Sequence, residues 1–174
     1  ISVGGVKLMA EVIKVIGKNA FVQVFESTRG MRVGDEAEFE GHMLEVTLGP
    51  GMLSRNYDGL QNDLDKMEGV FLRRGEYTFP LDNDKLWDFK PLAKVGDKVT
   101  AGGWLGEVDE NFQPHKIMVP FTFKGEYTVK SLKEAGQYTI GEVIAVLTDE
   151  TGKDVEVTMI QRWPVKRAIT CYKE

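Results

Sequence analysis

Alternating apolar and polar residues near the start of the chain predict a β-hairpin. Residues 10–16 read A-E-V-I-K-V-I and residues 21–25 read F-V-Q-V-F, with Gly-Lys-Asn at 17–19 between them. Both runs are rich in β-branched and aromatic residues, and a short Gly/Asn turn commonly joins two antiparallel strands. We therefore expect two paired strands on either side of residues 17–19.

A second pair of strands is expected directly after this hairpin. One strand runs from Gly34 to Phe39, and after a turn at residues 40–42 the other runs back from Met43 to Leu48. Three or four strands in this meander arrangement are typical of part of a small β-barrel or sandwich. We assign residues 1–48 to part of an N-terminal β-barrel.

The hydrophobic period changes beyond residue 48. Gly-Pro-Gly at 49–51 ends the strand pattern, and apolar residues then recur with helical spacing. The apolar positions of this run are Leu53, Tyr57, Leu60 and Leu64. The spacing predicts a short amphipathic helix, which Gly59 weakens by roughly 1 kcal/mol relative to Ala. Residues 49–68 are accordingly expected to be a connector with a short helix.

Residues 69–165 return to the β pattern. Turn signals separate short β-prone runs at spacings of roughly 8–12 residues, which fits a sandwich or closed barrel. The expected strands are Val70–Arg73, Lys98–Val99, Trp104–Val108, Lys116–Val119, Tyr127–Leu132, Val143–Leu147 and Val155–Ile160. The predicted fold class is therefore all-β with little helix: a partial barrel, then a β-sandwich or barrel-like domain. Residues 166–174 are expected to be a linker.

Composition and charge narrow the class of protein. The 174 residues are 42% hydrophobic and 28% charged, close to a globular average, so wholesale disorder is not expected. Lys and Arg number 22 against 27 Asp and Glu, a net charge of −5, and the only dense basic cluster is Arg162, Lys166 and Arg167. This balance argues against nucleic-acid binding. No apolar run approaches the roughly 18 residues of a membrane span, and the single cysteine favours a reducing, cytosol-type compartment.

The residues offer no phosphate-binding loop. That loop has the form G-x-x-x-x-G-K-[ST], because its backbone N–H groups surround phosphates while the Lys reaches the outer ones. The Gly-Lys pairs at 17–18 and 152–153 lack both the preceding Gly and a following Ser or Thr. The glycines at 4–5 and 49–51 also lack the strand–turn–helix setting of a dinucleotide site, so we interpret them as turns.

No other candidate catalytic, cofactor-binding or metal-ligating residues emerge. Asp82, Asp84 and Asp88 lack the Asp/Asn and Gly positions of a calcium loop, so a solvated acidic turn is the better interpretation. His115 is followed by Lys116 and not by a second ligand at metal spacing, and His42 lies in an expected turn. Nothing is arranged for Ser/His/Asp or Cys/His catalysis. Cys171, in the tail, is interpreted as an incidental exposed thiol.

One hypothesis for the function of the chain is that it is a lipoyl- or biotin-carrier module. Lys116-Ile117-Met118 loosely resembles the carrier signal, in which a Lys at an exposed hairpin tip takes the cofactor. The carrier signal has Met on both sides of that Lys, whereas His115 precedes Lys116 and residues 117–119 read as strand interior. A free-standing carrier or interaction module stays open as the second hypothesis.

Two segments resemble a known family. Residues 48–61 read L-G-P-G-M-L-S-R-N-Y-D-G-L-Q, similar to the L-G-P-G-L-L-x-x-x-[FY]-D-G-[IL]-Q segment of the catalytic A (alpha) subunit of vacuolar (V-type) and archaeal-type rotary ATPases. Residues 158–165 read T-M-I-Q-R-W-P-V and resemble the T-M-x-Q-x-W-P-V segment of the same subunit. Shorter similar runs occur at 71–75, 115–120 and 125–129. Residues 54–56 and 62–63 depart from the family pattern.

The resemblance implies a division of labour along the chain. Residues 1–48 look like the remainder of the N-terminal β-barrel, which joins the crown of an alternating head of A and B subunits. Residues 69–165 look like the inserted bulge, or non-homologous region, which lies near the peripheral stalk. The family's opening strands would precede Ile1, and residues 166–174 would lead toward a nucleotide-binding domain absent from this sequence.

The resemblance also implies function, partners and location. The parent subunit would use Mg-ATP and couple ATP hydrolysis or synthesis to proton or sodium transport. This segment would hold no cofactor, have no ATPase activity of its own, and serve head assembly and peripheral-stalk contact. Its partners would be the B subunits and the peripheral stalk subunits, with no nucleic acid and with the membrane reached only through the complex. It would be cytoplasmic, on the peripheral head.

Overall fold

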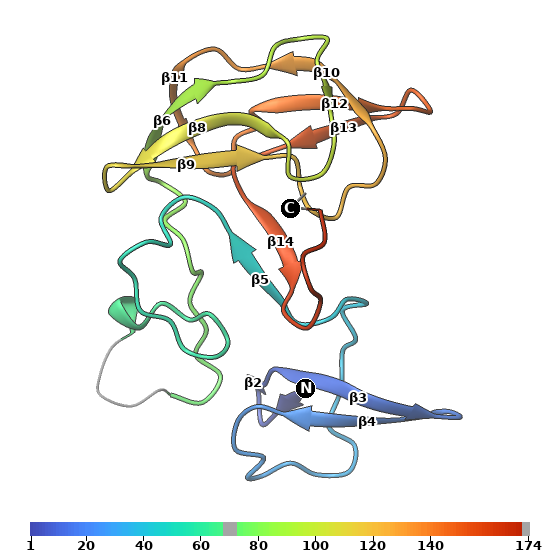
Figure 1. Ribbon diagram of the computed structural model, residues 1–174. Helices are drawn as coiled ribbons and strands as arrows, with labels where there is room; N and C mark the ends of the chain where they lie inside the picture. The colour runs from blue at the N-terminus through green and yellow to red at the C-terminus, as the bar shows by residue number, and fades with distance from the viewer. Residues whose placement is uncertain (68–72, 172–174) are drawn as a thin grey trace. The chain divides into compact units, whose positions relative to one another are not determined.

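The computed structural model describes residues 1–67 and 73–171, which fold mainly as short β-strands joined by turns and irregular segments (Figure 1). Among these residues the only helical element is one 3₁₀ turn, η1 (Leu64–Lys66). The all-β prediction is therefore confirmed. The chain divides into two compact units: unit 1 comprises Ile1–Leu44 and Lys66–Thr78, and unit 2 comprises Glu45–Asp65 and Phe79–Glu174.

Unit 1 contains two small antiparallel sheets. The short strands β1 (Ser2–Val3) and β2 (Val6–Lys7) pair with each other. The hairpin predicted around residues 17–19 is confirmed: β3 (Ala10–Ile16) pairs with β4 (Asn19–Val24). Gly17 has φ 58°, a left-handed conformation that glycine adopts without steric cost, and so closes the turn.

One face of the β3–β4 hairpin is entirely apolar. Directly paired residues share a face, and the register pairs Ala10 with Val24, Val12 with Val22 and Val15 with Ala20. The opposite face carries polar residues such as Glu11 and Gln23, which are also paired with each other. Val12, Val15 and Val22 are 42%, 65% and 37% exposed, so unit 1 leaves much of this apolar face uncovered.

The second predicted pair of strands is wrong. Residues 34–39 form no strand, and β5 (Glu45–Leu48) belongs to unit 2, where it pairs with β14 (Gln161–Pro164). The run 35–40 reads D-E-A-E-F-E, and its four acidic residues disfavour a strand. Asp35 instead accepts a hydrogen bond from the Arg32 N–H at 2.7 Å and stabilises a turn.

The predicted amphipathic helix across residues 53–64 is also wrong. The segment is an irregular loop in which Asp58 Oδ1 accepts hydrogen bonds from the backbone N–H groups of Leu60 (2.9 Å) and Asn62 (2.8 Å). Ser54 and Gln61 both have φ 62°, outside the helical range. Short polar side chains that bond nearby backbone compete with helix formation, which explains the failure of the apolar spacing as a signal.

Unit 2 is built from two four-stranded sheets and the β5–β14 pair (Figure 1). One sheet has the order β13-β12-β10-β7 and the other β11-β6-β8-β9. Their strands are β6 (Leu86–Pro91), β7 (Lys98–Val99), β8 (Trp104–Glu110), β9 (Gln113–Met118), β10 (Tyr127–Leu132), β11 (Gly136–Thr139), β12 (Ala145–Asp149) and β13 (Asp154–Val157). Six predicted strands are confirmed within a few residues, whereas β6, β11 and β14 were not predicted. The expected strand Val70–Arg73 lies almost wholly outside the described residues.

Two hydrophobic clusters form the core of unit 2. One contains Trp87, Phe89 and Ile117, and the other contains Leu105, Val129 and Leu147, all at most 4% exposed. Residues alternate between buried and exposed along β6, as expected for a strand with one face on a core. Burial of these side chains is the main stabilising contribution to this unit.

Gly106 is the position where this core requires glycine. A Cβ there would lie 2.2 Å from Cε2 of Phe89 and 2.8 Å from the Lys90 carbonyl oxygen. Phe89 is 1% exposed, so its ring has no space into which to move. Gly106 pairs with Pro91 of the neighbouring strand β6, and the β8–β9 register shifts between Trp104 and Gly106.

Candidate interaction site

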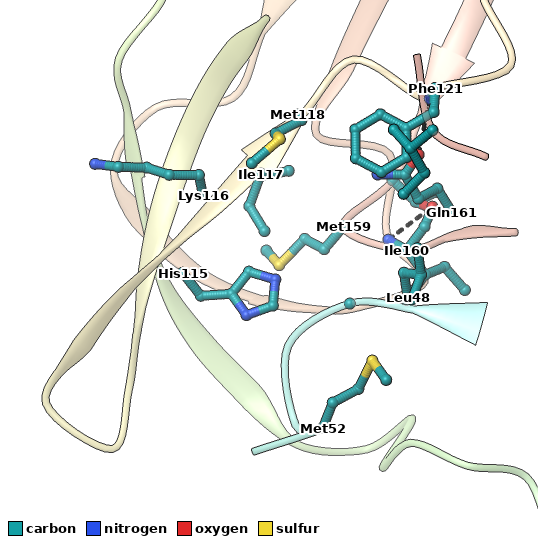
Figure 2. Close-up of a pocket in the computed structure, with 13 residues that line it drawn as sticks. Leu48, Met52, His115, Lys116, Ile117, Met118, Phe121, Met159, Ile160 and Gln161 are labelled. Atoms are coloured by element: carbon teal, nitrogen blue, oxygen red, sulfur yellow. Dashed lines mark hydrogen bonds between the residues drawn. The ribbon is translucent and has the colours of Figure 1, made fainter. Parts of the chain in front are cut away.

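A hollow of about 270 Å³ lies in unit 2 where β5, β9 and β14 approach one another (Figure 2). Its lining residues are Leu48, Gly49, Met52, His115, Lys116, Ile117, Met118, Phe121, Thr158, Met159, Ile160, Gln161 and Ile169. The volume is smaller than that of most drug-sized ligand pockets, which have about 300–1,000 Å³. A hollow of this size suits one or two apolar side chains better than a nucleotide.

The lining is mostly apolar and adaptable. Met52 and Met159 extend toward the hollow, and Met118 lies at its upper edge (Figure 2). Methionine is unbranched and polarizable, so it adjusts to differently shaped apolar partners. Lys116 extends away from the other lining residues (Figure 2), and its ammonium pairs with Glu107 and lies 4.9 Å from the centre of the Trp104 ring. The hollow therefore favours apolar contact over charge recognition.

Glu110 fixes the loop that carries Met52. Its side chain is 2% exposed, and its Oε1 accepts hydrogen bonds from the backbone N–H groups of Gly51 (2.7 Å) and Leu53 (2.9 Å). Its second oxygen, Oε2, lies 2.6 Å from Nδ1 of His115. A buried carboxylate is costly unless it is bonded in this way, so the three contacts tie the 51–53 loop to β8 and β9.

Gln61 fixes the same loop from its other end. Its side-chain oxygen accepts a hydrogen bond from the Thr47 N–H, and its side-chain NH₂ donates to the Thr47 carbonyl, both at 2.7 Å. The side chain thus occupies a position on β5 that another strand could otherwise pair with, while β14 pairs on the opposite side. The loop 48–65 is therefore held at both ends by side-chain to backbone bonds.

Burial, a neighbouring carboxylate and hydrogen bonds shift the pKa values of two groups in this loop. Burial raises the pKa of the Tyr57 hydroxyl, and the carboxylate of Asp63 raises it further. The pKa of Asp58 is lowered overall: burial alone would raise it, but hydrogen bonds from Asn62 and Leu60 to the carboxylate outweigh that effect. Asp58 therefore stays ionised and keeps the loop bonded at neutral pH.

The residues considered for catalysis or metal binding are not brought together. His115 is beside Glu110, whereas His42 is in unit 1, with its Nδ1 2.9 Å from the Met43 carbonyl oxygen. Asp82 Oδ1 accepts a hydrogen bond from the Asp84 N–H, as in a local turn. Among residues 1–67 and 73–171, no group of three or more His, Cys, Asp or Glu side chains is placed to hold a metal ion.

One further expectation is modified, and another is confirmed. Cys171 is half-buried, not exposed as expected, because its sulfur lies against Gly102, 3.5 Å from where a Cβ of that glycine would be. Lys116 lies within β9 opposite Glu107, and not at the hairpin tip that a carrier lysine would occupy. The ammonium of Lys116 is also engaged with Glu107, so the geometry offers no support for the carrier alternative.

Family comparisons match both units. Residues 78–166, more than half of the chain, match the family described as the ATP synthase alpha/beta subunit barrel-sandwich domain. The chain belongs to the ATP synthase alpha/beta subunit family. Residues 1–41 match the β-barrel domain of the same family. The resemblance to this family is thereby confirmed.

Curated relatives agree with this assignment to the ATP synthase family. The chain is 48% identical over its whole length to a V-type ATP synthase alpha chain from Treponema denticola and to one from Borrelia garinii subsp. bavariensis. It is 46% identical to the V-type ATP synthase alpha chain 1 of Treponema pallidum. The chain spans about 30% of the length of these relatives. Within the part of the chain that the structure describes, no helix is long and apolar enough to cross a membrane.

Proposed function

We propose that this chain is a non-catalytic segment of the catalytic A (alpha) subunit of a V-type ATP synthase, and that it serves head assembly and peripheral-stalk contact. The observation that carries the proposal is the 46–48% identity to V-type alpha chains across the whole segment, together with family matches to both units. In this proposal the parent subunit binds Mg-ATP and couples its hydrolysis or synthesis to proton or sodium transport.

The geometry of the described residues supports a binding role. The apolar face of β3–β4 is largely uncovered, and the methionine-lined hollow of unit 2 accommodates apolar side chains. Neither feature presents a nucleophile with a base, or a cluster of backbone N–H groups with a lysine, as phosphoryl chemistry requires. Apolar surface with few charges is the composition expected at the centre of a protein interface.

The proposed partners follow from the parent complex. B subunits alternating with A subunits would cover the barrel region represented by unit 1, and peripheral stalk subunits would contact the barrel-sandwich region of unit 2. The segment would then lie on the peripheral, cytoplasmic head and reach the membrane only through the assembled complex. Its net charge of −5 favours partners whose contact surfaces carry a basic or neutral rim.

A direct binding titration tests the proposal. The 174-residue chain is immobilised and titrated separately with purified stalk subunits and with the B subunit of the same ATP synthase. We expect saturable binding of a stalk subunit, weakened by added unlabelled full-length A subunit. The control analyte is the same stalk subunit after heat unfolding. Absence of saturable binding to any subunit of the complex would contradict the proposed role.

A further inference from the structure

The tip of the β8–β9 hairpin has an unusual backbone. Glu110 pairs with Gln113, so only Asn111 and Phe112 form the turn, and both have positive φ, 54° and 64°. These are the angles of a two-residue type I′ turn, which matches the twist of the flanking strands. The favoured sequence for this turn is Asn-Gly, because the second residue has to adopt the left-handed conformation.

Phenylalanine is a poor residue for that position. A side chain with a Cβ destabilises the left-handed conformation, and a bulky residue there is uncommon. Burial of the ring does not offset this energetic cost within unit 2, since Phe112 is 97% exposed. Phe112 therefore opposes the local backbone and exposes a large apolar surface to solvent. Strain of this kind at an exposed position is a reason to look for a function outside the chain.

Hydrogen bonds hold the backbone around Phe112 in place. Asp109 Oδ1 accepts a hydrogen bond from the Phe112 N–H at 3.0 Å, and Asn111 Nδ2 donates to Ser54 Oγ at 3.2 Å. Leu53, next in the chain to Ser54, is 47% exposed, and its N–H is bound by buried Glu110. Hydrogen bonds thus join the hairpin tip to the 51–54 loop, and each of the two segments exposes one apolar side chain, Phe112 and Leu53.

The chemistry around the ring selects the kind of partner. Residues 109–114 read D-E-N-F-Q-P and include no Lys or Arg, which disfavours a nucleic acid or an anionic lipid surface. One exposed aromatic side chain among polar groups, with the carboxylate of Asp109 beside it, is instead the pattern of a protein-interface hot spot. A second copy of this acidic chain would bring like charge together, so a different protein with an apolar pocket and a neutral or basic rim fits better.

We propose that Phe112 is an anchor residue that inserts into an apolar pocket of a different subunit of the ATP synthase, with Leu53 at the edge of the same contact. The inference rests on the proposed function in that it takes the partner from the same complex. It goes further in assigning the contact to one side chain, and in explaining why the turn contains Phe where Gly would suit the fold.

Site-specific photocrosslinking in the complete complex tests the location of the contact. A photoreactive phenylalanine, p-benzoylphenylalanine, replaces Phe112 in the full-length subunit, and a control complex carries it at Val95, which is 66% exposed. We expect position 112 to crosslink to one other kind of subunit and position 95 to give little of that product. Crosslinks only within the same chain, only to a second copy of it, or no more than at position 95, would each overturn the proposal.

The variant Phe112→Gly separates an anchor from a structural role. Glycine suits the turn, so we expect the melting temperature of the 174-residue chain to be unchanged or higher. Binding of the crosslinked subunit to this variant should weaken about 30-fold, as for loss of a typical hot spot, whereas Val95→Gly should leave binding unchanged. A lower melting temperature with unchanged binding would overturn the proposal. If the unaltered chain binds the complex and Phe112→Gly binds equally well, the proposed function stands and the anchor is wrong; if the unaltered chain does not bind, the proposed function fails.

Discussion

The two units use the same kind of strand but cover it differently. In unit 2, β6, β8 and β12 turn apolar residues toward cores in which Phe89 and Leu147 are at most 1% exposed. In unit 1 the β3–β4 hairpin has an equally apolar face, yet Val15 on that face is 65% exposed. A two-stranded hairpin is marginally stable alone in water, and needs further strands or a partner against its apolar face. The difference shows that the apolar pattern fixes which face will be buried, but not what buries it.

The largest expected difference is in stability, when a valine is replaced by lysine in the core of unit 2 or on the open hairpin face of unit 1. Val129→Lys puts an unpaired ammonium in the core of unit 2, where Val129 is 1% exposed, and should destabilise unit 2 by more than about 4 kcal/mol. Val15→Lys places it on the open hairpin face and should change the stability by no more than about 0.5 kcal/mol. Denaturant unfolding monitored by tryptophan fluorescence measures the first effect. A similar loss of stability for both variants would remove the distinction between the units.

Val15→Lys should have a different effect on association. Because the open face and the strand edges beside it can template contacts between copies, we expect the unaltered chain to self-associate at high concentration and the variant to do so less. Light scattering across a concentration series measures this. Strictly monomeric behaviour of the unaltered chain would show that the apolar face does not drive self-association.

The close contact between Gly106 and the Phe89 ring should make unit 2 sensitive to a single added methyl group. Gly106→Ala forces a methyl group against the Phe89 ring and should destabilise unit 2 by about 2–3 kcal/mol. Gly141 is the matched control, because a Cβ there meets nothing within 4 Å and its φ is not positive. Chemical denaturation of both variants gives the free energies of unfolding. Equal values for the two would show that the β6–β8 contact is looser than described.

The buried carboxylate gives a smaller effect. Glu110→Gln keeps one oxygen for the Gly51 and Leu53 N–H groups but loses the charge and the acceptor that faces His115, so we expect a loss of about 1–2 kcal/mol. Glu156→Gln, at an exposed position on β13, is the control and should be neutral. Thermal unfolding of both proteins tests this. If the two variants have the same stability, Glu110 does not hold the 51–53 loop.

Replacing Asp58 should change how steeply the stability of the chain falls at acid pH. Its folded pKa lies below the usual 3.8, so the stabilising contribution is complete above that value and is lost as the pH falls through the lower folded pKa. Asp58→Asn lacks this titration, and its stability should fall less steeply than that of the unaltered chain below pH 3.8. Urea unfolding between pH 6 and 3 measures both slopes. Parallel slopes would show that the carboxylate does not hold the loop.

Added nucleotide should have the smallest effect on the stability of the chain. A specific site at 100-fold saturation would stabilise the fold by about 2.7 kcal/mol, which corresponds to a melting shift of roughly 5–10 °C for a chain of this size. We expect a shift within noise in millimolar magnesium-ATP, and phosphate release no greater than the blank. A saturable rise of several degrees would place a nucleotide site within residues 1–174 and contradict the proposed division of labour.

The sequence predicts strands well where local signals are complete. Tyr127–Leu132 was predicted with the observed bounds, since β-prone residues lie between clear turns. Sequence-based prediction fails where residues far apart in the chain determine the pairing of strands. β5 pairs with β14, and no local pattern in either strand indicates its partner. β6 was missed because Asp88 and Pro91 weaken its β pattern, although Trp87 and Phe89 make it a central part of the core.

The candidate site shows the same limit. Glu110 looks like any surface acid in the sequence, and its role depends on backbone N–H groups of a loop far away in the chain. Phe112 had a usable signal, because an Asn followed by a non-glycine residue between two β-prone runs is an unfavourable tight turn. The helix predicted over residues 53–64 failed for the opposite reason, since the apolar spacing was present but side chains such as Asp58 bound the backbone instead.

Hydrogen exchange measures directly whether this segment contacts other subunits of the complex. The full-length subunit is measured alone and in the assembled, nucleotide-free ATP synthase, and peptides covering residues 10–24 and 109–113 are compared with peptides from the core strand β12. We predict that assembly slows exchange in the hairpin and at the β8–β9 tip, whereas exchange in the core strand β12 changes little. Unchanged exchange at both 10–24 and 109–113 on assembly would contradict it.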